Sequence, residues 1–536
     1  MKAALRPGWA QVLALLLAAA AGGLRSELSW LAFAVLVSAW FIRSGPGLAV
    51  AGREAAALFF CWLAAASVFS PDPALSLPAL VKYALAGLIF FSAAASPDGR
   101  QAWLKCVYAL GAAAAVTLLA QRLSGGWVIG LIGQNPNYSA AFCAAGFPAA
   151  LLGAVPDGGK KEKVLKALLA LLLGAGVIAS GSRGALLAAV VAAAAGLAAS
   201  RRWTALLAFA AAALGAAALL PGETWAGLLK FSDPRAFARP RLWGAALEAA
   251  AASPLLGWGP GLFSRAFEIF KFPFFDGISY YGHGTLHAHS EALNLAAEAG
   301  FPAALFFLAA AAGGLLRRGG SLPLKLCAFA VLAQGSVDMI FYSGAVALLF
   351  WGSLGFAGAG DGQALYPGRG WRLAAGLLLP AGLLLPALSA LAPAGAAFAA
   401  QAEAAAVKNP ALALALVRRQ GLDYPKDPFL KEAEGRLLAS LNDPAGAEAA
   451  FSAALALEPR FAAARLGLAG AYAAKGRAAE ACRLLAKPEL DPIAQLRTPY
   501  QRGLALYGDK AALELKKKIC GKKKTGGATA PGRKTR

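Results

Sequence analysis

The residues best suited to chemistry lie in one long polar stretch between apolar segments. Residues 231–300 contain all three histidines of the chain, His283, His287 and His289, together with several arginines. A neutral imidazole can act as a general base because its pKa lies near neutral pH. The histidines do not have the spacing of a known metal site, and few carboxylates accompany them. We therefore expect proton transfer rather than metal binding in this stretch.

Arginines in two places could carry chemistry, and for Arg183 this would be phosphate binding. Arg183 lies in the sequence ASGSRGALLA, where one apolar segment ends and the next begins, and Ser182 and flanking glycines would let a ligand approach closely. Arg239 and Arg241 lie at the start of a short helix expected over 240–252. A guanidinium group matches phosphate oxygens in two-point geometry. The alternative for Arg183 is a side chain that only extends to the membrane interface.

Amide and aromatic side chains could complete a polar substrate site. Asn135 and Asn137 flank a proline at the start of an apolar segment, so they form either a turn and helix cap or an amide pair that contacts substrate. The tryptophans and tyrosines of the long stretch are Trp243, Trp258, Tyr280 and Tyr281. They could stack on sugar rings or belong to the aromatic band of a membrane interface.

The elements that must position these residues are membrane spans. The chain is 59% hydrophobic and only 15% charged, whereas soluble domains carry about 25% charge. Apolar runs near the ~20 residues that a bilayer requires follow one another, which predicts an all-α polytopic membrane protein with about 12–14 spans. The expected spans are 1–23, 28–43, 55–70, 78–96, 102–120, 138–155, 164–180, 184–200, 203–220, 292–316, 323–340, 344–360 and 372–394. The first is interpreted as a retained helix rather than a cleaved signal peptide.

Charge in the short loops predicts the orientation. With the N-terminus in the cytoplasm, most lysines and arginines of the short loops fall on the cytoplasmic side. The membrane domain would cover 1–398, and its long loop, 221–291, would face the opposite, extracytoplasmic side. The C-terminal region would lie on that side too.

The region 399–515 is predicted to be a separate domain of helical repeats. Small residues, a turn and an Ala-rich helix ending at proline recur with a period of about 33 residues, which resembles tetratricopeptide repeats. Such repeats offer a concave face to a protein partner. The alternative is a helical hairpin without a binding role.

The last segment, 516–536, is rich in lysine and is predicted to be disordered. It could contact anionic lipid or glycan groups. Nucleic acid is not expected as a partner, because no binding module accompanies the tail. Cys482 and Cys520 could form a disulfide if this end of the chain is extracytoplasmic.

Four strings in order resemble the O-antigen ligase/polymerase family over about 55–360. They are GQNPN before a span, GSRGALL, the loop RLWGAALEAAAASPLLGWGPGLF, and HAHSEALNLAAEAGFPAALFF. Members of this family are integral-membrane glycan transferases at the outer face of the bacterial inner membrane. The resemblance implies transfer of a glycan from an undecaprenyl diphosphate carrier to an acceptor hydroxyl, with neither a metal nor another cofactor.

The resemblance also implies a set of catalytic residues. By motif, Arg183 matches the Ser-Arg-Gly arginine, Arg241 the loop arginine, and His289 the histidine that opens the next span. Arg239 and His287 are rivals for the last two roles. The family commonly has Asn after this histidine, where this chain has Ser290.

The acceptor stays open at this point. Lipid A–core would make the chain a ligase, a growing glycan a polymerase, and a protein side chain an oligosaccharyltransferase. A transporter or flippase of lipid-linked glycans is the alternative from another class. It predicts ionisable residues within spans, for which Asp338 is the best candidate. A scaffold with an inert loop is a third possibility.

Overall fold

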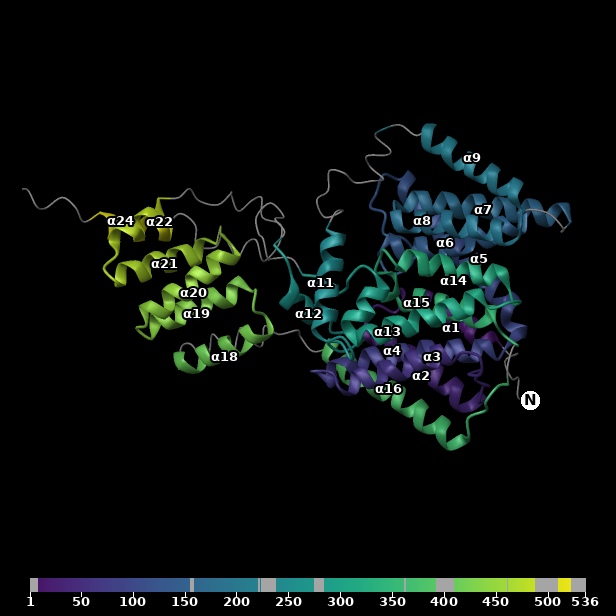
Figure 1. Ribbon diagram of the computed structural model, residues 1–536, viewed down its shortest axis with the longest axis horizontal. Helices are drawn as coiled ribbons and strands as arrows, with labels where there is room; N and C mark the ends of the chain where they lie inside the picture. Colours follow the sequence, from purple (N-terminus) through teal and green to yellow (C-terminus); the bar gives the residue numbers. More distant parts are fainter. Residues whose placement is uncertain are drawn as a thin grey trace, which may run out of the picture. The chain divides into compact units, whose positions relative to one another are not determined.

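The computed structural model of the chain describes residues 8–154, 159–219, 222, 238–273, 284–360, 363–391, 409–459, 461–486 and 510–521. In these ranges the regular structure is helical, and the strand-like feature there is one isolated bridge between Leu48 and Leu365. The expected all-α class is confirmed. The chain divides into a membrane unit, Met1–Phe263 with Leu286–Pro393, and a repeat unit, Ser264–Thr285 with Ala394–Arg536 (Figure 1).

Apolar helices occupy every expected span of the membrane unit. They are α1 (Trp9–Ala20), α2 (Glu27–Ser44), α3 (Glu54–Val68), α4 (Pro73–Ala94), α5 (Arg100–Leu123), α6 (Pro136–Ala154), α7 (Lys160–Ser180), α8 (Arg183–Ala199), α9 (Trp203–Leu219), α13 (Glu291–Leu316), α14 (Leu322–Gly335), α15 (Gly344–Ala357) and α16 (Arg369–Leu391). Among the described residues, six helices are long and apolar enough to cross a membrane. They are α2, α4, α5, α7, α13 and α16. The chain is a polytopic helical membrane protein, and the full span count stays a prediction.

Helix α15 lies at the centre of the membrane unit. All of its residues are buried except Ala347, which is half-buried. Trp351 packs among the rings of Phe59, Phe90 and Phe307, which come from α3, α4 and α13. Gly352 lets α5 approach, because a Cβ there would lie 2.3 Å from the ring of Trp103. Small residues at such crossings let membrane helices pack closely. This packing fixes the positions of the helices around α15.

Helix α13 is broken at Gly300, and the break holds part of the long loop. Gly300 has φ 82°, and Phe301 N–H donates to Pro254 O at 2.9 Å. Residues 257–261 form the turn that the glycines predict, and Gly259 N–H donates to Glu298 O at 2.7 Å. A Cβ on Gly300 would lie 2.0 Å from Leu255 O, so only glycine fits. The loop after α11 (Arg239–Ala252) is thereby fixed against the first half of α13.

The repeat unit contains paired helices with a regular offset. Its helices are α18 (Pro410–Asp423), α19 (Pro428–Ser440), α20 (Pro444–Leu457), α21 (Ala462–Ala474), α22 (Ala478–Leu485) and α24 (Lys510–Cys520), and Figure 1 shows α18 to α21 stacked in sequence. The starts of α19 and α21 differ by 34 residues (428 to 462), and so do those of α20 and α22 (444 to 478). This is the period of a tetratricopeptide repeat. Asp427 and Asp443 cap α19 and α20, and Phe451 and Phe461 fill the core between the pairs.

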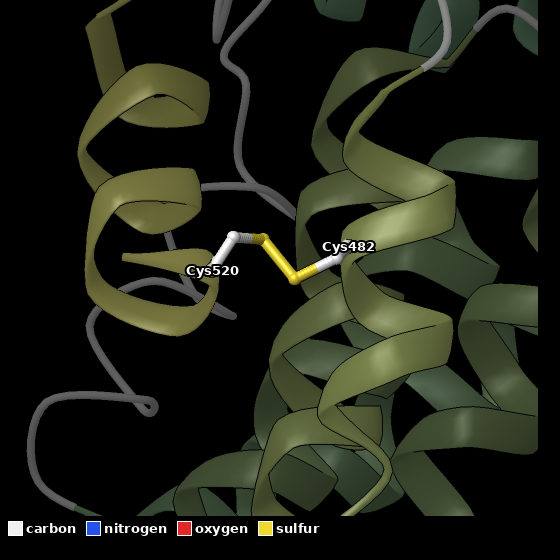
Figure 2. Close-up of a disulfide and its surroundings, with 2 residues drawn as sticks. All are labelled: Cys482 and Cys520. Atoms are coloured by element: carbon white, nitrogen blue, oxygen red, sulfur yellow. A yellow bond between two sulfur atoms is a disulfide. The ribbon is translucent and has the colours of Figure 1, made fainter. Parts of the chain in front are cut away.

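A disulfide joins Cys482 of α22 to Cys520 of α24, with Cα atoms 5.8 Å apart (Figure 2). The pairing expected for an extracytoplasmic tail is present. Disorder was predicted to begin at 516, but residues 516–520 form the last turns of α24. The prediction is wrong there because the disulfide and packing against α21 and α22 hold this helix. The rest of the tail, 522–536, lies outside the described residues.

One part of the long loop groups with the repeats rather than with the membrane domain. Helix α12 (Phe263–Phe270) carries Arg265, whose Nη2 lies 2.5 Å from Asp423 Oδ1. Lys426 Nζ donates to Lys271 O at 2.5 Å. The prediction for 221–291 was that all of it belongs to the membrane domain. In the structure Ser264–Thr285 group with the repeats, because Arg265 and Lys271 O find their partners in α18 and the turn that follows it.

Candidate active site

Asp338 is the centre of the candidate site. It lies in the turn after α14 and is only 2% exposed. Its Oδ2 accepts a hydrogen bond from Asn137 Nδ2 at 2.7 Å, and its Oδ1 accepts one from Met339 N–H at 2.9 Å. Arg239 Nη2 lies 3.6 Å and His289 Nδ1 3.7 Å from the same Oδ1. One carboxylate thus joins residues from three distant parts of the chain.

Arg183 begins α8 beside this carboxylate. Gly181 ends α7 in the left-handed conformation, with φ 67°, and the Ser182 side chain accepts from Ala185 N–H at 3.3 Å as the cap of α8. A Cβ on Gly184 would lie 3.7 Å from the Cβ of Asp338. The expected position of Arg183, where one apolar helix ends and the next begins, is confirmed.

Four helices begin around Asp338. Asn137 lies in the first turn of α6, Arg183 and Arg239 are the first residues of α8 and α11, and His289 comes two residues before α13. The N-terminal end of a helix carries a partial positive charge and binds anions. Arg239 adds a full positive charge beside the negative charge of Asp338. The helix ends together therefore favour an anion near this place.

Arg239 and Arg241 have different surroundings. Arg239 Nη1 donates to Val337 O at 2.7 Å, and its guanidinium group also approaches Asp338. Arg241 follows two residues later on the same turn and is exposed. Residues two apart on a helix point to different sides. Arg239 and His289 thus both lie next to Asp338. The role of Arg241 stays a prediction.

His289 occupies a turn with an uncommon backbone. Its φ is 56°, in the left-handed region, and Trp243 Nε1 donates to its carbonyl oxygen at 3.4 Å. Its Nδ1 is buried and makes no hydrogen bond within the described ranges. Ser290 is the buried N-cap residue of α13, but its side chain makes no capping hydrogen bond. Asp338, 3.7 Å from His289 Nδ1, is a carboxylate that could orient the imidazole.

His287 is held next to His289 in a less polar position. Its ring centroid lies 4.4 Å from that of Tyr342. Burial, and secondarily the nearby His289, lower the pKa of His287 to about 4, so it is neutral at pH 7. A recess of about 10 Å³, enough for about one water molecule, is lined by His287, His289, Ser290, Glu291, Asn294, Met339 and Tyr342. A hydroxyl group is small enough to enter it.

The remaining predicted residues have these positions. Asn135 Oδ1 accepts from Asn137 N–H at 2.9 Å, which confirms the turn, while the Asn137 side chain reaches Asp338. Tyr280, Tyr281 and His283 lie outside the described residues. In the described part of the chain, no three His, Cys, Asp or Glu side chains lie close enough to hold a metal ion.

The sequence does not predict that Asp338 belongs to the site. It indicates Asp338 only as the ionisable residue that a transporter would need within a span. The available signal was a lone carboxylate at the outer end of an apolar segment. Sequence reasoning also missed Gln334, whose Nε2 donates to Asn137 O at 3.1 Å, and Arg25, which lies 5.9 Å from the ring centroids of both Tyr138 and Tyr342. Neither residue has a local sequence pattern that marks it.

Comparison with known proteins agrees with this geometry. Residues 168–308 match the family model of the O-antigen ligase, a segment that includes Arg183, Arg239, Arg241 and His289. Residues 438–491 match a tetratricopeptide repeat model. No curated protein matches the chain. The chain is therefore an O-antigen ligase-like membrane protein with a C-terminal tetratricopeptide repeat region.

Proposed function

We propose that this protein transfers a glycan from undecaprenyl diphosphate to an acceptor hydroxyl at the periplasmic face of the bacterial inner membrane. The observation that carries the proposal is the meeting of four helix N-termini around the buried Asp338, with Arg239 and His289 beside its carboxylate. The match to the O-antigen ligase family model over this region supports glycan transfer in general.

The geometry supports a single displacement. Arg183 and Arg241 would hold the diphosphate and stabilise the charge that develops as the bond between the anomeric carbon and the phosphate oxygen breaks. His289 would accept the acceptor's hydroxyl proton as that oxygen attacks the anomeric carbon from the opposite face. The products are the new glycoside, with inverted configuration, and undecaprenyl diphosphate.

Asp338 acts in this scheme as a positioning residue. Its carboxylate lies 3.7 Å from His289 Nδ1, close enough to stabilise the imidazolium that forms when His289 takes a proton. Asn137 and Met339 hold the carboxylate in place, and Arg239 lies beside it. Arg239 therefore acts on His289 through Asp338, while Arg241 is assigned to the diphosphate.

The location follows from the loops and the disulfide. Disulfides persist in oxidising compartments such as the periplasm, which supports a periplasmic repeat unit. Labelling of intact cells with a thiol-reactive polyethylene glycol tests this. Cys482 and Cys520 should become reactive only after reduction. Thiols that stay unreactive after reduction of intact cells, and react only once the inner membrane is permeabilised, would contradict the periplasmic assignment.

The acceptor is the finer question, and lipid A–core is the first choice. A polymerase that acts on a growing glycan and a protein O-oligosaccharyltransferase are alternatives within the same reaction. The repeat region favours a protein partner, either as an acceptor or as a recruited neighbour. The flippase alternative loses its main support, because Asp338 is already contacted by Asn137 in a turn rather than exposed within a span.

The test is transfer from a labelled undecaprenyl diphosphate glycan by the purified protein. Lipid A–core, a carrier-linked glycan and a peptide pool are supplied in separate reactions, and the mass of the product names the acceptor. The Arg183→Gln variant should lose transfer, whereas Arg318→Gln, which changes an exposed arginine at the other end of α13, should keep it. Label that stays on the carrier with all three acceptors would overturn the proposal.

A further inference from the structure

His289 has a backbone conformation that other parts of the protein must hold. Its φ of 56° lies in the left-handed region, which is uncommon for a residue that carries a side chain. Such a conformation persists only where the surrounding contacts impose it. The contacts around this turn therefore show which residues place the His289 imidazole.

Asn294 holds the turn on the N-terminal side of His289. Its Oδ1 accepts a hydrogen bond from Ala288 N–H at 3.1 Å, and this N–H belongs to the peptide group that joins His287 to Ala288. Ala288 is fully buried, and Asn294 is only 7% exposed. On the other side, Trp243 Nε1 donates to the carbonyl oxygen of His289 at 3.4 Å. The turn is thus held from both sides, and Asn294 accepts the shorter of the two hydrogen bonds.

Asn294 is fixed in turn by Glu298, one turn further along α13. Residues four apart share one face of a helix, and these two side chains interact. Because Ala288 N–H occupies the oxygen of Asn294, the amide NH₂ is the group that can bond the Glu298 carboxylate. Glu298 is only 4% exposed, and its Oε1 accepts from Phe263 N–H at 3.2 Å. This face of α13 therefore holds both the histidine turn and the end of the loop after α11.

We propose that Asn294 is a positioning residue that places His289, through the backbone of this turn, beside Asp338. The inference rests on the proposed glycan transfer, in which His289 accepts the acceptor's proton. Asn294 also lines the recess shared by His287 and His289. Its amide takes up no proton at neutral pH, so its contribution is to geometry. A reacting group that is displaced by about 1 Å can slow a reaction roughly a hundredfold.

The first experiment measures transfer kinetics with two variants of Asn294. Asn294→Leu removes the acceptor of the hydrogen bond at nearly the same side-chain volume. Asn294→Ala also removes it but leaves room for a water molecule to bond Ala288 N–H, so it should have the smaller effect. Asn294→Leu should lower kcat roughly 10–100-fold and change the KM for the donor by less than about threefold, because the donor diphosphate is assigned to other residues.

Ser353→Ala is the matched control. Ser353 is fully buried in the second half of α15, and its Oγ accepts from Trp103 Nε1 at 3.0 Å. The variant removes a buried hydrogen bond of the membrane unit that does not involve the histidine turn. It should lower the melting temperature and leave kcat unchanged when transfer is measured well below that temperature.

Chemical labelling measures the position of His289 without requiring transfer. Diethyl pyrocarbonate modifies imidazoles, and the chain has three histidines, so mass spectrometry can assign each one. The His289 side chain is 24% exposed, and a loosened turn should expose more of it. Asn294→Leu should therefore label His289 several-fold faster than the wild type does, whereas Ser353→Ala should label it at the wild-type rate.

Two results would overturn the proposal: equal labelling of His289 in the wild type and folded Asn294→Leu, or transfer by Asn294→Leu with the wild-type kcat. A wild type that transfers no glycan would overturn the proposed function instead. The labelling rates would then decide by themselves whether Asn294 places His289.

Discussion

The two ends of the membrane unit both carry arginines, but their partners differ. At the end with the candidate site, Arg239 lies beside the buried carboxylate of Asp338. At the other end, Arg100 donates to Phe356 O and Ala359 O, and Arg372 donates to Ile42 O. Those carbonyls lie at the C-terminal ends of α15 and α2, where helices leave acceptors unsatisfied.

The difference shows that the partner, not the residue type, determines what an arginine does here. An arginine that caps a helix adds stability and leaves the chemistry alone. In the proposed mechanism, Arg239 beside the buried Asp338 would influence His289, the residue assigned to proton transfer. Removing residues at the two ends should therefore change different measurements.

The largest effect is expected from Asp338→Ala. The change leaves Asn137 and Arg239 without their buried partner and removes the group that orients His289. Breaking such a pair costs about 3 kcal/mol of stability, and we expect transfer to fall roughly a hundredfold or more. Melting temperature and transfer rate are measured together. The conservative variant Asp338→Asn should recover stability but little transfer. Full transfer by Asp338→Asn would show that transfer does not need the carboxylate.

Two glycines of α13 give a matched pair. Gly300→Ala places a Cβ 2.0 Å from Leu255 O at a positive φ and should lower stability by about 2–4 kcal/mol. It should also lower transfer, because the loop that it displaces follows α11, whose Trp243 donates to His289 O. Gly313→Ala, in open space near the other end, should be neutral or stabilise the helix by about 0.5–1 kcal/mol. Thermal melting distinguishes the two, and equal melting temperatures would mean that the break at Gly300 is not needed.

Arg100→Ala should affect stability alone. The variant removes the arginine donor from Phe356 O and Ala359 O, which costs about 1–2 kcal/mol. Transfer by the protein that remains folded should match the wild type at a temperature well below melting. A loss of transfer comparable to that of Asp338→Ala would show that the two ends are not independent.

Acid should lower the stability of the folded protein through His287. Because the pKa of His287 is lowered to about 4 in the folded protein from 6.5, the unfolded chain binds more protons between these values. Stability should therefore fall as the pH drops from 6.5 towards 4, and it should be about 1.5 kcal/mol lower at pH 5 than at pH 6.5. Thermal melting at several pH values measures this, and His287→Gln should flatten the curve. An unchanged slope in that variant would assign the acid sensitivity to another group.

The sequence predicts the elements of the fold better than their contacts. Apolar length predicts the spans, and the positions of Arg183 and His289 at helix starts follow from local motifs. The contact between Asn137 and Asp338 joins residues 201 apart and leaves no local pattern. The break at Gly300 depends on a loop that packs against it, and the pairing of Arg265 with Asp423 depends on the repeat unit. Such contacts arise only when distant segments pack together.

The most direct test of the account is single-turnover glycan transfer by His289→Ala beside His287→Ala. If His289 accepts the acceptor's proton, its replacement should slow transfer by about 10²–10⁴ while the melting temperature stays near that of the wild type. His287→Ala should retain more transfer, because His287 lies against Tyr342 rather than beside Asp338. A His289→Ala transfer rate within about threefold of the wild-type rate would contradict the assignment of His289 as the base. In free energy, such a change is smaller than a shift of one pKa unit.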